Sequence, residues 1–254
     1  MSEDIRTFRW FTFIFLMFIL LSLTAIIDGF GATDNPGIAP PDSKPGGFSY
    51  GEWSAKWWQW AYSMPINANP LFDTAPGSAG QSGNVWFLGS AINTEQKPSG
   101  EVVSKADRKL TVTVGTMLFF PIMNVEGSKL EGDGDTELDL KNYASGFVGN
   151  ITDMFADIDG VPVKDLQQYR AQSTLFTIGP LPDNNIFQFF GARAPAGSTT
   201  PSVADGFYLM LEPLSIGTHT IHFGGTAEFI SDPNEPGFKL FKQEATYQIT
   251  VKEK

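Results

Sequence analysis

The chain has no cysteine and only two histidines among its 254 residues. The absence of cysteine excludes disulfide bonds, a thiolate nucleophile, and zinc or iron–sulfur sites with cysteine ligands. Basic residues are also few: the chain has 17 Lys and Arg and 28 Asp and Glu, which gives a net charge of −11. A protein this acidic, with no basic cluster in its sequence, repels the phosphate backbone of nucleic acids. We therefore expect no nucleic-acid partner.

The two histidines and the missing motifs limit the classes of enzyme. His219 and His222 are three residues apart in an expected strand, so their side chains point to opposite faces and cannot share a metal ion without a bulge. No Gly-x-Ser-x-Gly nucleophile elbow occurs, and the stretch Gly80–Asn84 does not match its spacing. These absences favour a binding or structural module over an enzyme. A polysaccharide hydrolase that uses only carboxylates stays open, because its carboxylate pair cannot be chosen from the sequence.

The N-terminus predicts export. After residues 1–9, which include Arg6 and Arg9, an uncharged apolar run of 18 residues extends from Trp10 to Ile27. This run is long enough to span a bilayer, and the basic residues before it predict that the N-terminus stays inside and the rest is outside. Gly29–Gly31 also offers small residues for signal cleavage. An anchor (residues 10–27) and a cleaved signal peptide both remain open, so we expect an extracytoplasmic domain that is either membrane-anchored or secreted.

The remaining chain predicts a tether and one domain. Residues 28–47 are rich in Gly, Pro and Asp, which is typical of a linker, and residues 48–254 form the expected domain. Alternating apolar residues predict strands near the C-terminus, with a turn at 213–217 that joins the first two strands as an antiparallel pair. We expect a mainly β fold with two covering helices (α+β), an antiparallel sandwich of the immunoglobulin-like or jelly-roll-like kind.

Three shorter segments carry further local signals. Residues 117–122 are apolar on both faces, which predicts a strand in the middle of a sandwich or under a helix. The pair Asp159 and Gly160 predicts a tight hairpin. Residues 179–200 are rich in Pro, Asn and Gly, and we expect a long loop there.

Two helices are expected to cover this sandwich. The first is a tryptophan-rich helix that starts after Ser49, where Ser49 and Glu52 form a capping box, and ends before Pro65. Four of the six tryptophans lie within it, and Trp53, Trp57 and Trp60 share the face that we expect to be buried. The second helix is expected to start after a cap at Thr136 and to continue through Phe155, with its apolar side on a sheet.

Trp58 and Tyr62 are the candidate binding residues. Both fall outside the buried stripe of the tryptophan-rich helix at 100° per residue. Exposed aromatic side chains in these places would stack on sugar rings or contact an envelope protein. The alternative is that both are simply buried under the turn-rich segment 67–83.

An acidic loop is the candidate metal site. Asp133, Asp135 and Glu137 alternate with Gly and Thr, a spacing that partly matches a calcium loop. The match is incomplete because Thr136 stands where the loop requires Gly, and Asn142 stands where it requires a bidentate Glu. The alternatives are a divalent cation such as calcium and a solvated loop that caps the next helix. No other cofactor is expected.

Several ordered motifs carry a resemblance. The chain resembles a family of exported prokaryotic proteins of unknown function, on the motifs Trp53–Trp60, Gly80–Leu88, Phe119–Asn124, Asp157–Val163 and Asp205–Leu209, the last followed by Gly217–Gly225. The resemblance implies an exported domain and brings no catalytic residues. The partners expected are the membrane, through residues 10–27, and a glycan or envelope protein. A role as an accessory subunit of a membrane complex is a further alternative.

Overall fold

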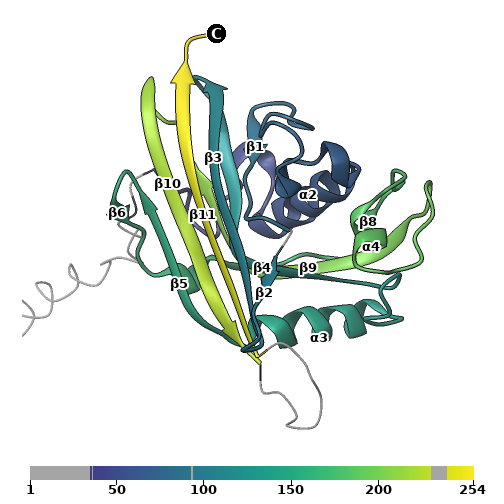
Figure 1. Ribbon diagram of the computed structural model, residues 1–254. Coiled ribbons are helices and arrows are strands. Elements are labelled where there is room, and N and C mark those ends of the chain that lie inside the picture. Colours follow the sequence, from purple (N-terminus) through teal and green to yellow (C-terminus); the bar gives the residue numbers. More distant parts are fainter. Residues whose placement is uncertain (1–34, 36, 93, 230–238) are drawn as a thin grey trace, which may run out of the picture. The chain divides into compact units, whose positions relative to one another are not determined.

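The structure is a computed structural model that describes residues 35, 37–92, 94–229 and 239–254 (Figure 1). The chain divides into two units, residues 1–34 and 35–254, and all the described residues belong to the second. The predicted membrane segment 10–27 therefore lies outside the described residues. Within the part of the chain that is described, no helix combines the length and the apolar character needed to cross a bilayer.

The described strands form two mixed sheets. The first has the order β1–β4–β9–β7, with β8 also paired to β9, and the second has the order β2–β3–β11–β10–β5–β6. In Figure 1 the long strands of the second sheet stand upright, and β4 and β9 of the first sheet run across them. The strands of the first sheet are β1 (Val85–Phe87), β4 (Met117–Ser128), β7 (Arg170–Gln172), β8 (Phe176–Ile178) and β9 (Thr200–Leu211). Those of the second are β2 (Glu95–Gln96), β3 (Glu101–Thr113), β5 (Ile151–Ile158), β6 (Val161–Pro162), β10 (Gly217–Glu228) and β11 (Leu240–Lys252).

The prediction of a mainly β, sandwich-like α+β fold is confirmed, but two details of the sheets differ from it. The pairs β1–β4 and β3–β11 are parallel, so the sandwich is not purely antiparallel. The prediction that β9 and β10 pair as a hairpin is wrong, because β9 pairs with β4, while β10 pairs with β11 and β5. β9 is buried along nearly its whole length, whereas β10 alternates between buried and exposed residues. The five residues 212–216 therefore carry the chain from one sheet to the other.

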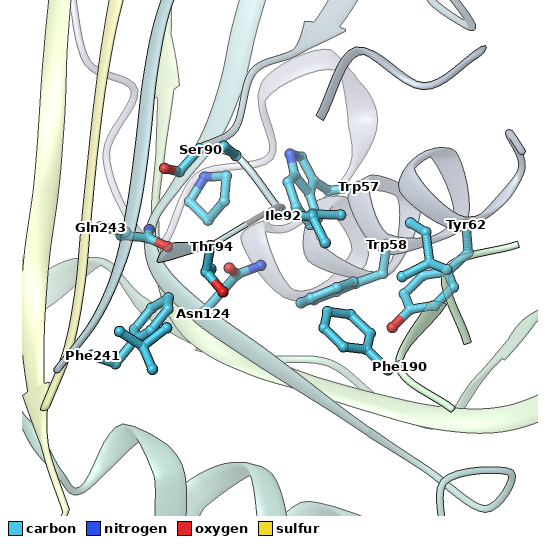
Figure 2. Close-up of a pocket in the computed structure, with 14 residues that line it drawn as sticks. Trp57, Trp58, Tyr62, Ser90, Ile92, Thr94, Asn124, Phe190, Phe241 and Gln243 are labelled. Carbon is cyan, nitrogen blue, oxygen red and sulfur yellow. The ribbon is translucent and has the colours of Figure 1, made fainter. Parts of the chain in front are cut away.

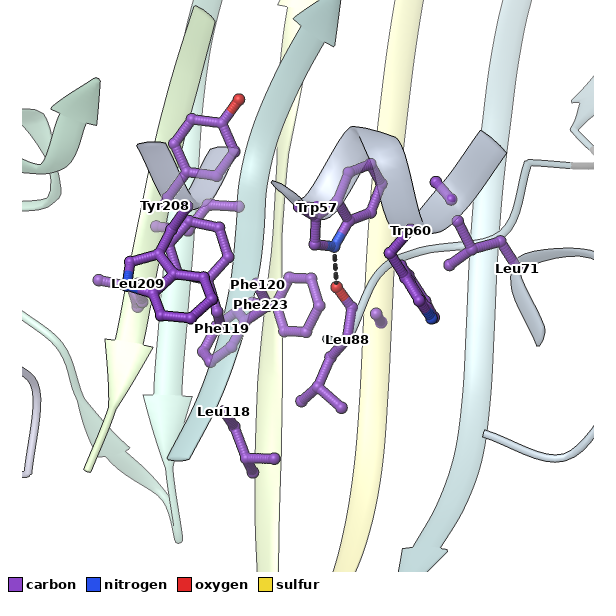
Figure 3. Packing of buried hydrophobic residues seen from close by; sticks show 14 of the residues in the cluster. Trp57, Trp60, Leu71, Leu88, Leu118, Phe119, Phe120, Tyr208, Leu209 and Phe223 are labelled. Carbon is purple, nitrogen blue, oxygen red and sulfur yellow. Dashed lines mark hydrogen bonds between the residues drawn. The ribbon is translucent and has the colours of Figure 1, made fainter. Parts of the chain in front are cut away.

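The two sheets meet through β4. The ring of Phe120 on β4 lies 4.6 Å, centroid to centroid, from that of Phe223 on β10. From β11, the side chain of Gln243 donates a hydrogen bond to the carbonyl oxygen of Ile122. Figure 3 shows how Phe119 and Phe120 pack in this core. The continuous apolar run of β4 is thus explained by its place between layers, as the sequence predicted.

The tryptophan-rich helix forms as expected. α2 (Tyr50–Tyr62) has Ser49 as its N-cap and Glu52 as the partner in the capping box. It contacts β4 and β9, and it buries the predicted stripe of Trp53, Trp57 and Trp60. Trp57 is 4% exposed, and its Nε1 donates a 2.7 Å hydrogen bond to the carbonyl oxygen of Leu88 (Figure 3). A buried indole whose N–H forms a hydrogen bond adds a large apolar surface to the core without leaving a polar group unpaired.

The second helix is shorter than predicted. α3 (Glu137–Val148) is capped by Thr136 as expected, but it ends at Val148, so the prediction of helix through Phe155 is wrong. Residues 151–158 form β5 instead. Ile151, Met154 and Phe155 have helical spacing, but the backbone of β5 pairs with β10, and pairing of this kind overrides a short local pattern. The predicted tight hairpin follows, with Asp159 and Gly160 both at positive φ between β5 and β6.

Shorter elements complete the unit. Residues Ile38 and Ala39, in the segment expected as a tether, are buried, and Ile38 forms a bridge with Leu211 of β9. The segment expected as a long loop between Gly179 and Thr200 contains the short helix α4 (Ile186–Phe189). The short 3-10 helices are η1 (Pro45–Gly47), η2 (Ile66–Ala68), η3 (Pro70–Phe72) and η4 (Leu166–Tyr169).

Candidate binding cavity beside the tryptophan-rich helix

A cavity of about 370 Å³ opens beside α2, and we call it the aromatic cavity (Figure 2). Its walls come from α2, β4, α4 and the residue after it, the ends of β3 and β11, and the segment between β1 and β2. The lining is mostly apolar, and a few polar groups face it. The residues that line it are Trp57, Trp58, Tyr62, Ser90, Ala91, Ile92, Thr94, Val102, Pro121, Asn124, Ile186, Phe190, Phe241 and Gln243.

Both candidate binding residues line this cavity. Trp58 and Tyr62 are one helical turn apart on α2, and their ring centroids lie 5.7 Å from each other. Trp58 is only partly buried, and Figure 2 shows Phe190 close to it. Tyr62 is 4% exposed and packs on Phe187 of α4 at 4.3 Å between centroids. The helical spacing thus identified two neighbouring side chains of one wall, but it did not predict that α4 would cover Tyr62.

A small polar group lies at the back of the aromatic wall. The side chains of Asn124 and Trp58 approach the hydroxyl of Tyr208, whose pKa is raised above its ordinary value mainly by burial. Tyr208 is completely buried and therefore stays neutral. Nδ2 of Asn124 and Nε1 of Trp58 are buried without a hydrogen bond of ordinary geometry to any described residue. Because both donors are buried and lie against the Tyr208 hydroxyl, they belong to the wall and are not free to meet a ligand.

A buried carboxyl pair supports the wall from behind. The hydroxyl of Tyr62 donates a hydrogen bond of 3.2 Å to Oε1 of Glu126, which is 5% exposed. Burial, and then the charge of Glu131, raise the pKa of Glu126 well above its usual range. Burial also raises the pKa of Glu131. The pair therefore retains a proton at pH values where an exposed glutamate has lost it.

Sequence reasoning missed Glu126. It stands in β4 after the apolar run has ended at Met123, and a single Glu between Val125 and Gly127 carries no recognisable motif. The one available signal was its place in the same strand as that run, because a carboxyl group that becomes buried must find a polar partner or stay protonated.

The candidate metal residues have separate partners. Asp133 accepts a 2.9 Å hydrogen bond from the backbone N–H of Ser128. Asp135 forms an ion pair with Lys129 at 3.0 Å, and Glu137 forms one with Lys141 at 2.6 Å. No group of three or more His, Asp or Glu side chains suited to a metal ion occurs in the described ranges. The calcium site stays a prediction that these contacts do not support.

The two histidines occupy different surroundings. Nδ1 of His219 lies 2.7 Å from Asp159, and this hydrogen bond raises the pKa of the imidazole above its ordinary value. His222 lies between two carboxylates, with Nδ1 3.1 Å from Asp157 and Nε2 3.1 Å from Glu244. Each imidazole therefore has its own carboxylate partners.

Comparisons with known proteins add little. No family model matches the chain, and no curated protein matches it. A cysteine protease inhibitor from Entamoeba histolytica aligns with 59% of this chain and 96% of its own, at 11% identity and a TM-score of 0.19. The solution structure of amebosin aligns with 58% of this chain and 96% of its own, at 10% identity and a TM-score of 0.19. Similarity at this level carries no conclusion about fold or function, and the resemblance to exported prokaryotic proteins stays an expectation.

Proposed function

We propose that this chain is an extracytoplasmic binding module that takes a small, largely apolar ligand in the aromatic cavity. The observation that carries the proposal is the convergence of Trp58, Tyr62 and Phe190 on one hollow of about 370 Å³. Specific small-molecule sites are typically apolar hollows of this order with a few polar groups that orient the ligand. Gln243 supplies such a group here.

The location and the finer fold belong to the same proposal. The apolar segment 10–27 would hold the module at the membrane or direct its secretion, and its partners would be envelope components. The sandwich would be of the immunoglobulin-like or jelly-roll-like kind. Successive long strands that change sheets, as β3 to β4 and β9 to β10 do, support this relationship.

The hydrolase alternative receives less support. A general acid needs a raised pKa, which Glu126 has, but it must also reach the substrate. Glu126 is 5% exposed and lies behind Tyr62, so a polysaccharide has no access to it in this conformation. We therefore assign Glu126 and Glu131 a role in supporting the cavity wall.

The test uses an apolar fluorescent probe and two adjacent phenylalanines. Phe190 lines the cavity and Phe189 does not, although both side chains are about half exposed, at 58% and 47%. We expect Nile red to bind the protein with increased emission, and Phe190→Ala and Trp58→Ala to weaken this binding while Phe189→Ala leaves it unchanged. Thermal unfolding of each variant identifies any general loss of structure. Equal binding by Phe190→Ala and Phe189→Ala would contradict the proposal.

A further inference from the structure

A second hollow lies beside α2, and none of its lining residues belongs to the aromatic cavity. Its volume is about 460 Å³, and we call it the Lys56 groove. It lies between α2 and the segment 80–87, so two motifs of the sequence, the tryptophan-rich helix and Gly80–Leu88, form it together. Its lining consists of Phe48, Trp53, Lys56, Gln59, Trp60, Ser63, Gly80, Ser82, Gly83, Asn84, Val85 and Phe87.

The polar lining offers uncommitted hydrogen-bonding groups. Ser82 and Asn84 are exposed, and neither side chain forms a hydrogen bond within the described residues. Gln59 donates through Nε2 to the carbonyl oxygen of Thr177 at 2.9 Å, which leaves its Oε1 available. Hydroxyl and amide side chains both donate and accept hydrogen bonds. They therefore match the hydroxyl groups of a sugar, which do the same.

Aromatic rings form the apolar part of the groove. Phe48 is 37% exposed and packs edge-on against Trp53, with 5.3 Å between ring centroids. The half-buried ring of Phe87 lies 5.5 Å from that of Trp60. Such surfaces pack against the C–H faces of sugar rings, while polar side chains at the edge bind the hydroxyl groups.

Among the described residues, Lys56 is the one ionisable side chain in the lining of this groove. The protein has 28 acidic and 17 basic residues, yet none of the carboxylates in the described part of the chain lines the hollow. Nζ of Lys56 lies 4.2 Å from the centroid of the Phe48 ring and forms no ion pair within the described part of the chain. Glu52, one turn earlier, accepts hydrogen bonds from the N–H and the hydroxyl of Ser49. Glu52 and Lys56 attract each other by charge, but Glu52 does not line the hollow, so the lining itself presents an ammonium group and no carboxylate among the described residues.

The loop that carries Ser82 and Asn84 is held in place by close packing on α2. Gly80 has φ +67°, and a Cβ at this position would lie 2.7 Å from Sδ of Met64 and 3.0 Å from Nε1 of Trp60. Gln81 anchors the same loop, because its Oε1 accepts a hydrogen bond from the N–H of Phe87 and its Nε2 donates to the carbonyl oxygen of that residue. A loop fixed in this way loses little conformational entropy when a ligand binds.

We propose that the Lys56 groove binds an acidic saccharide, a sugar chain whose ring carries a carboxylate. The rings of Phe48 and Phe87 contact the apolar face of the sugar. Ser82, Asn84 and Gln59 bind its hydroxyl groups, and Lys56 binds the carboxylate through a charge-assisted hydrogen bond. This site is separate from the aromatic cavity and does not depend on the function proposed for it.

Calorimetric titration with trigalacturonate and with its carboxyl-reduced, neutral counterpart tests the proposal. We expect the intact protein to prefer the acidic trisaccharide. Lys56→Gln should reduce affinity for it at least about tenfold, because hydrogen bonds to charged groups contribute at that level. The same substitution should leave affinity for the neutral sugar unchanged, whereas Asn84→Ala should weaken the binding of both. Lys109→Gln, at an exposed position on β3, is the matched control and should bind as the unaltered protein does.

Three outcomes would overturn the proposal: no binding of trigalacturonate at millimolar concentration, equal affinity of the intact protein for both sugars, or an unchanged affinity in Lys56→Gln. Nile red binding, measured on the same variants, distinguishes an effect on the Lys56 groove from an effect on the aromatic cavity. Lys56→Gln and Asn84→Ala should bind the probe normally, because neither residue lines the aromatic cavity.

Discussion

Replacing Glu126 by Gln should stabilise the protein, and the gain should grow with pH. In the folded protein the pKa of Glu126 is raised by burial and by Glu131, and the pKa of Glu131 is raised by its own burial. In the unfolded chain both groups titrate near their ordinary value of about 4.3. The folded state therefore binds a proton that the unfolded state has released once the pH exceeds that value.

The sign and size of the effect follow from this difference. The stability contributed by the protonated pair is fully present below the unfolded pKa and is lost as the pH rises toward the raised pKa of the folded state. Within that window one proton changes the free energy of unfolding by up to about 1.4 kcal/mol for each pH unit. The Gln side chain is neutral throughout, its oxygen can still accept from Tyr62, and its amide can donate to Glu131. Most of the pH dependence should therefore disappear in the variant.

Urea unfolding measured at several pH values provides the assay. We expect Glu126→Gln and the unaltered protein to have similar free energies of unfolding near pH 4, and the variant to be more stable at neutral and mildly alkaline pH. The exposed carboxylate of Glu253 is the matched control, and Glu253→Gln should reproduce the unaltered profile. The reasoning would be refuted by a variant that is less stable than the unaltered protein at alkaline pH, or by a difference that does not change with pH.

Two further predictions concern the core and the topology. Trp57→Ala should lower the free energy of unfolding by about 3–5 kcal/mol, because it removes a buried indole and leaves a cavity. Gln59→Ala, at an exposed position, should change the free energy of unfolding little. Urea titrations that show similar small losses for both variants would contradict the buried position of Trp57. A phosphatase that is active only outside the cytoplasm, fused after Lys254, should be active if residues 10–27 direct export, and a fusion with Trp10–Ile27 deleted should be inactive. Equal phosphatase activity in the two fusions would count against export by this segment.

Local signals in the sequence predicted the elements that form by local physical chemistry. The cap of α2 at Ser49, its stop before Pro65 and its buried tryptophan stripe all follow from hydrogen bonding and periodicity within a few residues. The same holds for the cap of α3 at Thr136 and for the Asp159–Gly160 turn. Trp58 and Tyr62 were selected by the same periodicity, which places them beside each other on one wall of a cavity.

Only the tertiary structure decided which segments meet. Residues 151–158 have the spacing of a helix and form a strand, because β10 provides a partner for their backbone. A short turn leads from β9 to β10, and yet β9 pairs with β4, because its long apolar run requires cover on both faces. The carboxyl pair of Glu126 and Glu131 also depends on the fold, since Glu126 lies on a strand and Glu131, five positions later, lies in a loop that folds back beside it.

The sequence by itself excluded chemistry that needs cysteine, and it predicted export, the mainly β class and the first helix. Each of these conclusions depends only on residue type or on short-range spacing. The aromatic cavity and the Lys56 groove depend on the tertiary structure, because each is formed by residues from separate elements. Asn124 on β4, Phe190 after α4 and Gln243 on β11 carry no signal of proximity in the chain. They become neighbours only because the two sheets pack on each other and α2 packs on β4 and β9.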